Sequence, residues 1–269
     1  MVGMHGLIEE PKAERNFMTY DDGNHLFHYT KFDRALKIII SKTLRFGKFE
    51  DMNDIAEVKR DIFANLPPKL VEEELNKYQS ISLTIDKNFP RGFSINPLWG
   101  HYADKGNGCC LVFNKNKLLT CFKKQFSEFN KKSKRITYKR KYSNAQFPQG
   151  NTLSEVSHYI KKDIKNIFFT KSFEWKYEQE YRLLMYSEKE EYLNFGDSLL
   201  AVILCLPKKE RWKESEEYKM LKHIVGKTPI LHYTTSFGDN ILKDEDDKIL
   251  YPTIGIDLHA DLSIKRNKI

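Results

Sequence analysis

Two glutamates and an arginine occupy every second position in a segment just past the middle of the chain. Glu178, Glu180 and Arg182 stand in the sequence WKYEQEYRLL at residues 175–184. Because successive side chains of a β-strand point to opposite faces, these three residues would share one face of a strand. On spacing alone we favour a surface ion-pair network. The alternative is an active site, in which a carboxylate stabilises positive charge during bond cleavage.

A second group of candidate residues is the sequence HYT, formed by His28, Tyr29 and Thr30. It lies at the end of an expected early strand. A histidine at this place is usually a satisfied polar group, but it can also orient a hydroxyl of a ligand. The sequence leaves both interpretations open.

A third group is WGHYAD, which contains Trp99, His101 and Tyr102 just before a glycine-containing turn. These rings could be core residues at the start of a helix. They could equally form a wall for a flat ligand ring, because aromatic rings stack on other rings.

Together, the three groups contain the residue types that cleave an N-glycosidic bond. A carboxylate such as Glu180 can stabilise the positive charge that develops on the ribose and fix a ribose hydroxyl. A ring such as Tyr102 can stack on the leaving base or on its cationic form. A histidine such as His28 can orient a hydroxyl. We therefore expect the three groups to meet in one cleft if the protein is an enzyme of this kind.

Several common catalytic and metal-binding sequence motifs are absent from the sequence. It contains no P-loop, no G-x-G-x-x-G, no H-E-x-x-H and no G-x-S-x-G. His25 and His28 would point to opposite faces of a strand, and the four cysteines form no C-x-x-C pair. We predict no metal site, although magnesium bound by carboxylates alone is compatible with the sequence.

The expected strands and helices follow one another irregularly. Apolar runs predict strands at residues 25–30, 44–46, 80–85, 109–113, 136–138, 175–184, 199–206 and 230–233, with a further strand at the end of the chain. Helical spacing predicts helices at residues 31–42, 70–77, 153–169 and 209–225 and within residues 49–63. This is an α+β pattern, with one domain over residues 25–269 after a polar lead-in at residues 1–24.

The bulk properties exclude several classes of protein. The 18 Phe and 14 Tyr argue against disorder. No apolar run reaches the roughly 18–20 residues of a transmembrane helix, and the first residues lack the layout of a signal peptide. We predict a reduced, cytoplasmic protein that does not bind membranes.

The basic residues are concentrated in residues 115–141, from Lys115 to Lys141. This segment contains eleven Lys and Arg and one acidic residue, whereas the whole chain has a formal net charge of +8. Phe122, Phe126 and Phe129 predict a short amphipathic helix, followed by a basic loop into a strand. The segment is a solvated surface or a phosphate-binding patch for nucleic acid or a dinucleotide.

The sequence resembles a bacterial family, Domain of Unknown Function 2971, between Phe27 and Tyr233. Four motifs that occur in order carry the resemblance: HYT at residues 28–30, Asn53-Asp54 with Glu57, WGHYADKGNG at residues 99–108, and KSFEWKYEQEYR at residues 171–182. The chain departs from the family pattern in a longer loop before Trp99 and in having Ile55 where proline usually follows the N-D pair.

This family is similar, at the level of motifs, to histidine–tyrosine–glutamate ADP-ribosyltransferases, which use NAD. The resemblance implies a split β core with peripheral helices, NAD as substrate, and a toxin or phage-defence effector that modifies nucleic acid, including RNA, or protein. It implies that His28 holds a ribose and that Tyr102, rather than Tyr29, stacks on nicotinamide. Glu180 would be the catalytic glutamate, Glu178 would orient the acceptor, and Arg182 would hold Glu180 or a phosphate.

Two other classes of function remain open on the sequence. The first is a nucleic-acid-binding protein or metal-dependent nuclease that uses Asp54, Glu57, Glu178 and Glu180. The second is a non-enzymatic sensor or scaffold, in which the motifs are only core and ion pairs. The position of His28 relative to Tyr102 and Glu180 discriminates between these and the NAD-dependent enzyme.

Overall fold

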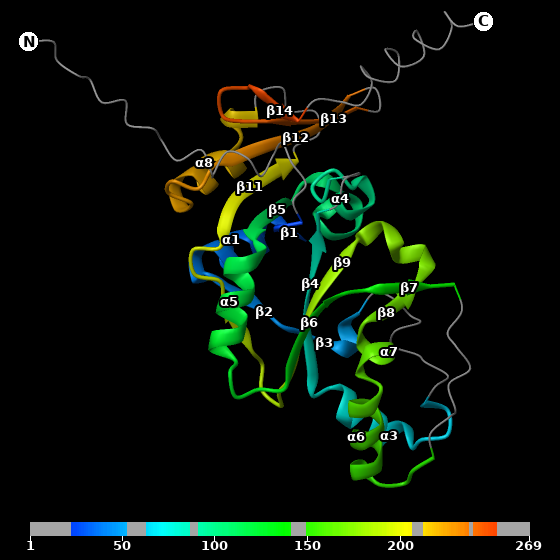
Figure 1. Cartoon of the computed structure of the whole chain (residues 1–269). Helices are drawn as coiled ribbons and strands as arrows, with labels where there is room; N and C mark the ends of the chain where they lie inside the picture. Colours follow the sequence, from blue (N-terminus) through cyan, green and yellow to red (C-terminus); the bar gives the residue numbers. More distant parts are fainter. Residues whose placement is uncertain are drawn as a thin grey trace, which may run out of the picture.

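Ten strands form one mixed sheet in the computed structural model, which describes residues 23–52, 63–86, 91–140, 149–205, 212–236 and 239–251 (Figure 1). The main path runs through β14 (Ile249–Tyr251), β13 (Asp239–Lys243), β12 (Ile230–Ser236), β11 (Leu199–Cys205), β5 (Cys109–Asn114), β1 (His25–Thr30), β4 (Tyr78–Ile85), β9 (Glu180–Tyr186) and β6 (Lys131–Arg135). The tenth strand, β3 (Gly47–Lys48), pairs with β4 beside this path. β11 and β12 run parallel, whereas β1, β5, β4, β9 and β6 pair antiparallel. The predicted α+β class is confirmed, and the β core is mixed.

Two small sheets flank the large one. β2 (Thr43–Arg45) pairs antiparallel with β10 (Tyr192–Asn194). β7 (Thr137–Lys139) pairs parallel with β8 (Thr170–Ser172).

Helices cover both faces of the large sheet (Figure 1). On one face, α1 (Phe32–Ser41), α5 (Lys115–Gln125) and α8 (Glu216–Ile224) contribute to one apolar cluster. On the other face, α4 (Asn96–Tyr102) packs over the middle of the sheet, and α3 (Pro68–Leu75), α6 (Leu153–Lys162) and α7 (Ile164–Phe168) pack beside β9. The helices are amphipathic, so each buries one apolar stripe against the sheet.

The sheet is split along β4. β1 pairs with β4 only at Leu26–Ile85 and Phe27–Thr84, and β3 pairs with β4 at residues 79–80. Between these two short ladders, at residues 81–83, β4 has no strand partner on that side among the described residues. The expected split β core is therefore present, and the gap opens toward the residues predicted to do chemistry.

Most predicted elements are confirmed within a few residues, but the segment around Glu178 differs. A 3-10 helix, η5 (Phe173–Glu178), replaces the first part of the expected strand, and β9 begins only at Glu180. Gln179, between them, has the left-handed φ of 48°, which a strand cannot contain. The prediction of one strand over residues 175–184 was therefore wrong in its first half.

Two other expectations are corrected. The single helix expected at residues 153–169 is interrupted at Asp163, which ends α6 and precedes α7. The basic loop expected after α5 is instead β6, the edge strand with the sequence KKSKR. Lysines suit such an edge, because their charge opposes pairing with another chain.

Some expectations fall outside the described residues. These are the lead-in at residues 1–22, Asn53, Asp54 and Glu57, and the helix expected after residue 52. Among the described helices, none is long and apolar enough to cross a membrane.

Candidate active site

The gap between β1 and β3 opens into a cavity of about 250 Å³. Its lining includes polar residues from four separate segments: His28, Ser82, Tyr102, Lys171, Glu178 and Glu180. His28, Tyr102 and Glu180 therefore line one cavity, which was the arrangement expected of an enzyme. The open solvent-exposed ion-pair network that spacing alone favoured is not formed, because Glu178 and Glu180 are 5% and 3% exposed.

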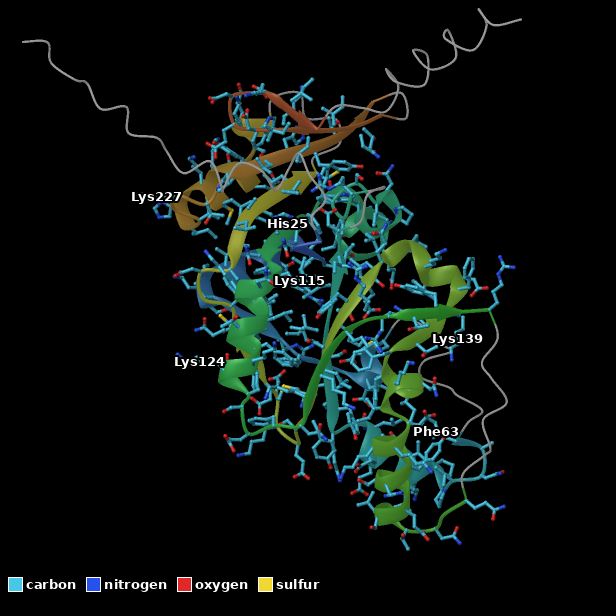
Figure 2. The ribbon with its side chains drawn as sticks, in the orientation of Figure 1. His25, Phe63, Lys115, Lys124, Lys139 and Lys227 are labelled. Carbon is cyan, nitrogen blue, oxygen red and sulfur yellow. The ribbon has the colours of Figure 1, made fainter. Side chains whose placement is uncertain are left out.

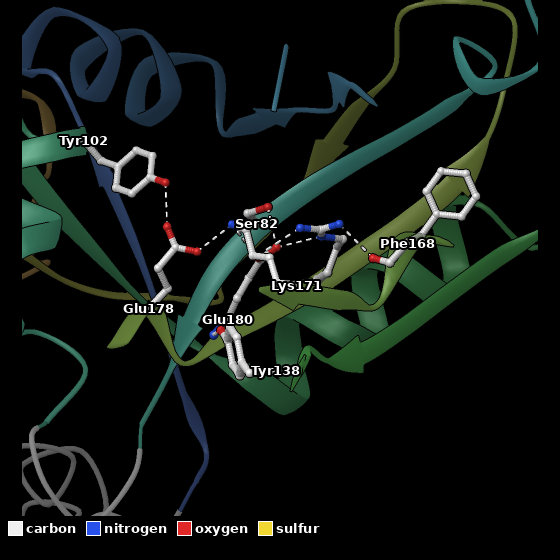
Figure 3. A network of polar contacts seen from close by, with 8 residues as sticks. Ser82, Tyr102, Tyr138, Phe168, Lys171, Glu178 and Glu180 are labelled. Carbon is white, nitrogen blue, oxygen red and sulfur yellow. Dashed lines mark hydrogen bonds and ion pairs between the residues drawn. The ribbon is translucent and has the colours of Figure 1, made fainter. Parts of the chain in front are cut away.

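Glu180 is held by three side chains (Figure 3). Its Oε1 accepts from Ser82 Oγ at 2.6 Å and from Arg182 Nε at 2.7 Å. Its Oε2 accepts from Arg182 Nη2 at 3.0 Å and from Lys171 Nζ at 3.3 Å. The bidentate contact with Arg182 fixes both the position and the charge of the carboxylate.

Glu178 has a different set of partners. Its Oε1 accepts a hydrogen bond from Tyr102 Oη at 2.6 Å, and its Oε2 accepts one from Lys171 Nζ at 2.7 Å. Lys171 therefore bridges the two carboxylates, while Tyr102 brings α4 into the same network (Figure 3).

These environments move the pKa values of the two carboxyls in opposite directions. For Glu178, burial is the largest cause and raises the pKa, and the negative charge of Glu180 adds to it, although Lys171 and Tyr102 oppose the shift. For Glu180, burial also opposes ionisation, but the charges of Arg182 and Lys171 outweigh it and lower the pKa to about 2. A pair with separated pKa values can combine a fixed anion with a group that exchanges protons.

The local backbone explains how both carboxylates reach Lys171. η5 brings the chain back toward the sheet, and Gln179 in its left-handed conformation redirects it into β9. The backbone N–H of Glu180 donates to Tyr138 Oη at 2.8 Å, and its carbonyl accepts from the Ile136 N–H at 2.9 Å. Positive φ at a residue other than glycine costs free energy, and such strain is concentrated at functional sites.

His28 faces the gap from β1. Burial, with a smaller contribution from Arg34, lowers its pKa to about 4, while a hydrogen bond with the backbone of Ser82 opposes this shift. The imidazole is therefore neutral near pH 7, where it can donate and accept a hydrogen bond but carries no charge.

The structure places the other residues of HYT and WGHYAD in different surroundings. Tyr29 lines the cavity, but its hydroxyl donates to the Gly92 carbonyl at 2.6 Å. Thr30 is buried and does not line the cavity. Trp99 is a core residue, because its ring stacks on Tyr233 at an interplanar angle of 7° and its Nε1 donates to the Phe93 carbonyl at 2.9 Å.

His101 and Arg182 also lie outside the cavity lining. His101 is exposed on α4, beside Trp175 and Tyr177. Arg182 is 0% exposed, and its Nη1 donates to the Phe168 carbonyl at 2.7 Å. Of its two proposed roles, the structure supports the holding of Glu180, since a buried guanidinium cannot reach a phosphate.

Three residues of the network were given no role on the sequence. Lys171 is part of the K-S-x-x-W motif, but its contact with two carboxylates depends on the turn at η5. Ser82 is an ordinary outward position of an alternating strand, and Tyr138 lies beyond the edge strand. Only the shared motif with Glu178 could have indicated Lys171; no sequence signal indicates Ser82 or Tyr138.

Two cations lie at the rim of the cavity. Arg45 Nη1 contacts Glu190 Oε1 at 2.9 Å, and Lys48 Nζ contacts Glu50 Oε1 at 3.6 Å. The four side chains are about half exposed (46–55%), so water competes for each pair and each contributes little stability. An anionic ligand could replace either carboxylate.

The charges in the network bear on the nuclease alternative. Lys171 and Arg182 already neutralise Glu178 and Glu180, so these carboxylates are not a set of free oxygen ligands. Among the described residues there is no group of three or more His, Cys, Asp or Glu that could hold a metal ion. Asp54 and Glu57 lie outside that part of the chain.

The basic segment divides between the two faces of the sheet. Lys115 and Lys124 lie on α5, which packs on the face that carries Tyr181 (Figure 2). Lys139 follows β6 in β7, on the side of α7, where its Nζ lies 3.3 Å from Asn166 Oδ1. Only the part of the segment in β6 and β7 approaches the carboxylate network.

Comparisons with known proteins agree with part of the resemblance. Residues 98–183 match the model of a family described as Protein of unknown function (DUF2971). This range contains WGHYADKGNG and KSFEWKYEQEYR, so the resemblance to this family is confirmed there. No curated protein matches the chain.

Two solved structures of DarT from Thermus sp. 2.9 are distantly similar to the chain. DarT in complex with carba-NAD+ is 16% identical and covers 76% of this chain and 92% of its own, with a TM-score of 0.34. DarT in complex with ADP-ribosylated ssDNA is 13% identical and covers 77% and 91%, with a TM-score of 0.32.

Proposed function

We propose that this protein is an NAD-dependent ADP-ribosyltransferase whose acceptor is nucleic acid or protein. The observation that supports the proposal most strongly is that His28, Tyr102 and the Glu178–Glu180 pair line one cavity, although they are far apart in the sequence. The motif resemblance suggests NAD as the substrate for such a site. A role as a toxin or phage-defence effector in the cytoplasm rests on that resemblance alone.

The cavity suits one end of NAD. At about 250 Å³ it is slightly smaller than the ~300–1,000 Å³ of typical ligand sites, so the nicotinamide and its ribose would occupy it. Arg45 and Lys48 at the rim would contact the diphosphate. The neutral imidazole of His28 would hold a ribose hydroxyl, and the ring of Tyr102 would lie against nicotinamide.

The two carboxylates would have separate roles. Glu180, with its low pKa, supplies a permanent negative charge that stabilises the positive charge developing on the ribose. Glu178, with its raised pKa, accepts the proton of the acceptor's nucleophile. As it does so, the nucleophile bonds to the ribose carbon, and nicotinamide leaves with the electron pair of the broken bond.

The test is to incubate the protein with NAD and with single-stranded DNA, RNA or protein. Release of nicotinamide and an increase in acceptor mass by one ADP-ribose are expected. Glu180→Gln should lower the rate by roughly 100-fold or more, because it removes the fixed charge. The exposed Glu188→Gln is the matched control and should retain the wild-type rate.

Circular dichroism of each variant separates loss of chemistry from loss of folding. If wild type neither releases nicotinamide nor modifies any acceptor, the proposal is wrong. If Glu180→Gln folds and retains full activity, the carboxylate has a different role from the one proposed. A sensor or scaffold would instead show a stability change in Glu180→Gln without any NAD turnover in wild type.

A further inference from the structure

Three aromatic rings lie together beside the candidate active site. The ring centroids of Trp175 and Tyr177 are 6.0 Å apart at an interplanar angle of 34°, and those of His101 and Tyr177 are 6.5 Å apart at 30°. His101 and Trp175 are 6.4 Å apart. His101 and Tyr177 are stacked, the other two pairs are tilted, and we call the three residues the aromatic platform.

The aromatic platform is accessible. His101 is exposed, and Trp175 and Tyr177 are half-buried. Tyr177 packs partly against the apolar cluster beneath α4, so the position of the platform is anchored by the core. A contiguous group of partly exposed rings is a feature of binding sites, whereas single exposed rings are ordinary.

The platform is joined to the carboxylate network. Lys171 Nζ lies 5.0 Å from the centroid of the Trp175 ring and also binds Glu178 at 2.7 Å. Tyr102, the partner of Glu178, follows His101 in the chain, and their ring centroids are 6.3 Å apart. A ligand on the platform would therefore lie on the side of the network that contains the proposed proton acceptor, Glu178.

Two exposed cations lie near the segment that carries the platform. Arg140 and Lys176, both exposed, lie 4.8 and 5.1 Å from the ring of Phe173, two residues before Trp175. The edge strand β6 continues directly into β7, which pairs with β8, the strand just before Phe173 (Figure 1).

A second cavity, of about 270 Å³, lies along this basic path. Its cationic lining residues are Lys132 and Lys134 of β6 and Lys165 of α7, all exposed. Lys134 is opposite Arg182 in the ladder between β6 and β9, so it lies on the sheet face of the carboxylate network.

Partly exposed rings with cations on the same path match the chemistry of unpaired nucleic acid. Bases of a single strand stack on aromatic side chains, while Lys and Arg contact the phosphates. An arginine side chain of a protein could also stack on the rings, but the exposed Lys176 and Arg140 would repel it. The charges therefore favour a nucleobase over a guanidinium group.

We propose that the aromatic platform binds a base of single-stranded nucleic acid and that the strand continues along β6 toward Lys132, Lys134 and Lys165. The interpretation of this platform as the site that binds the ADP-ribose acceptor rests on the proposed function. The binding itself does not depend on NAD, so the two can fail separately.

Tryptophan fluorescence tests the proposal in the wild-type protein. Trp99 and Trp212, the other two tryptophans, are 4% and 1% exposed, so Trp175 is the one open to a ligand. A single-stranded oligonucleotide of about twelve residues should quench the emission in a saturable way, because a base stacks on the indole. The DNA and RNA forms of one sequence distinguish the two sources of the base.

Anisotropy of the labelled oligonucleotide gives the affinity of variants. Trp175→Ala should weaken binding roughly tenfold or more, and Trp175→Phe should retain most of the affinity while losing the quenching. Lys134→Gln should reduce the log–log salt dependence by roughly 0.7, as expected for one lost phosphate contact. Tyr192→Ala removes an exposed ring on β10 and is the matched control with unchanged affinity.

Each remaining outcome overturns the proposal. These outcomes are wild type that binds no oligonucleotide, quenching that persists in Trp175→Phe, unchanged affinity in folded Trp175→Ala, and tighter binding of an arginine-rich peptide than of DNA or RNA. NAD turnover measured without acceptor separates the two proposals. Nicotinamide release with no oligonucleotide binding would disprove the proposed binding site on the aromatic platform but not the proposed enzymatic function. Oligonucleotide binding without nicotinamide release would disprove the proposed enzymatic function but not the binding site.

Discussion

The ammonium group of Lys171 lies 2.7 Å from the carboxylate of Glu178, and both side chains are about 95% buried. The same nitrogen reaches Glu180 at 3.3 Å. Since a buried carboxylate is costly unless it is paired, Lys171 is what allows two carboxylates to share the wall of one cavity. The following predictions concern this network and the residues around it.

Lys171→Met should destabilise the protein in a pH-dependent way. Loss of the cation leaves two buried carboxylates with less compensation, and the unfolding free energy at pH 7 should fall by about 3–5 kcal/mol. The substitution removes an influence that lowers the pKa of Glu178, so that pKa should rise further. A carboxyl with a raised pKa loses stability as pH rises through it, so part of the loss should be recovered at pH 5.

Urea unfolding at pH 7 and pH 5 measures this effect. Lys176→Met, in the same segment but exposed, should change the unfolding free energy by at most about 0.5 kcal/mol. Equal losses for Lys171→Met at both pH values would mean that Lys171 acts through packing and not through charge.

The pH dependence of transfer should report the ionisation of Glu178. If this residue accepts a proton, the rate should rise with pH through its pKa, which lies above the ordinary 4.5. Glu178→Gln should lower the rate by roughly 100-fold or more and remove that limb of the profile. Glu188→Gln should keep both the rate and the limb. A limb that survives in Glu178→Gln would assign the titration to another group.

His28 should make the protein less stable in mildly acidic solution. Its pKa is lowered from 6.5 to about 4, so the unfolded chain binds the proton more readily than the folded protein does. The stability that this group contributes is present above pH 6.5 and is lost as the pH falls toward 4. Between pH 7 and pH 5 the loss should be about 2 kcal/mol.

His28→Gln checks this value, because glutamine keeps hydrogen-bonding capacity but does not titrate. The unfolding free energies of wild type and variant should diverge between pH 5 and pH 7 by the amount given above. His158→Gln, on the outer side of α6, serves as the control. Parallel curves for wild type and His28→Gln would show that the histidine titrates normally.

The backbone conformation of Gln179 should carry a measurable cost. Gln179→Ala and Gln179→Gly both remove the buried side chain and differ from each other by one methyl group. The difference between their unfolding free energies therefore measures the cost of the left-handed φ of 48°. The glycine variant should be more stable than the alanine variant by about 1 kcal/mol. Thermal unfolding of the two proteins gives the comparison. An alanine variant as stable as the glycine variant would mean that the position is unstrained.

The fold was largely predictable because its strands carry strong periodic signals. HLFHYT buries five of its six side chains, β11 buries its central residues 201–204, and SISLTI alternates in sequence, so β1, β11 and β4 were recognised. The KKSKR strand was missed because it has no apolar residues of its own to give a pattern. It is a strand because it pairs with β9. The strand start at Glu180 was misplaced because the left-handed turn at Gln179 has no glycine to mark it.

The site was predictable only in part. Motifs indicated His28, Tyr102, Glu178 and Glu180, and the structure brings these to one cavity. The sequence left Trp99 open between the core and a ligand wall, and the structure places it in the core, where its ring packs against Tyr29 and Tyr233. Ser82 could not be found, because its position beside Glu180 depends on the pairing of β4 with β9.

The short ladder between β1 and β4 has a mechanical consequence. Two residue pairs, Leu26–Ile85 and Phe27–Thr84, join the half of the sheet that contains β5 and β11 to the half that contains β9 and β6. The cavity has walls on both halves, with His28 on one and Glu180 on the other. A molecule that touches both walls would therefore link the two halves of the sheet next to the place where only these two residue pairs join β1 to β4.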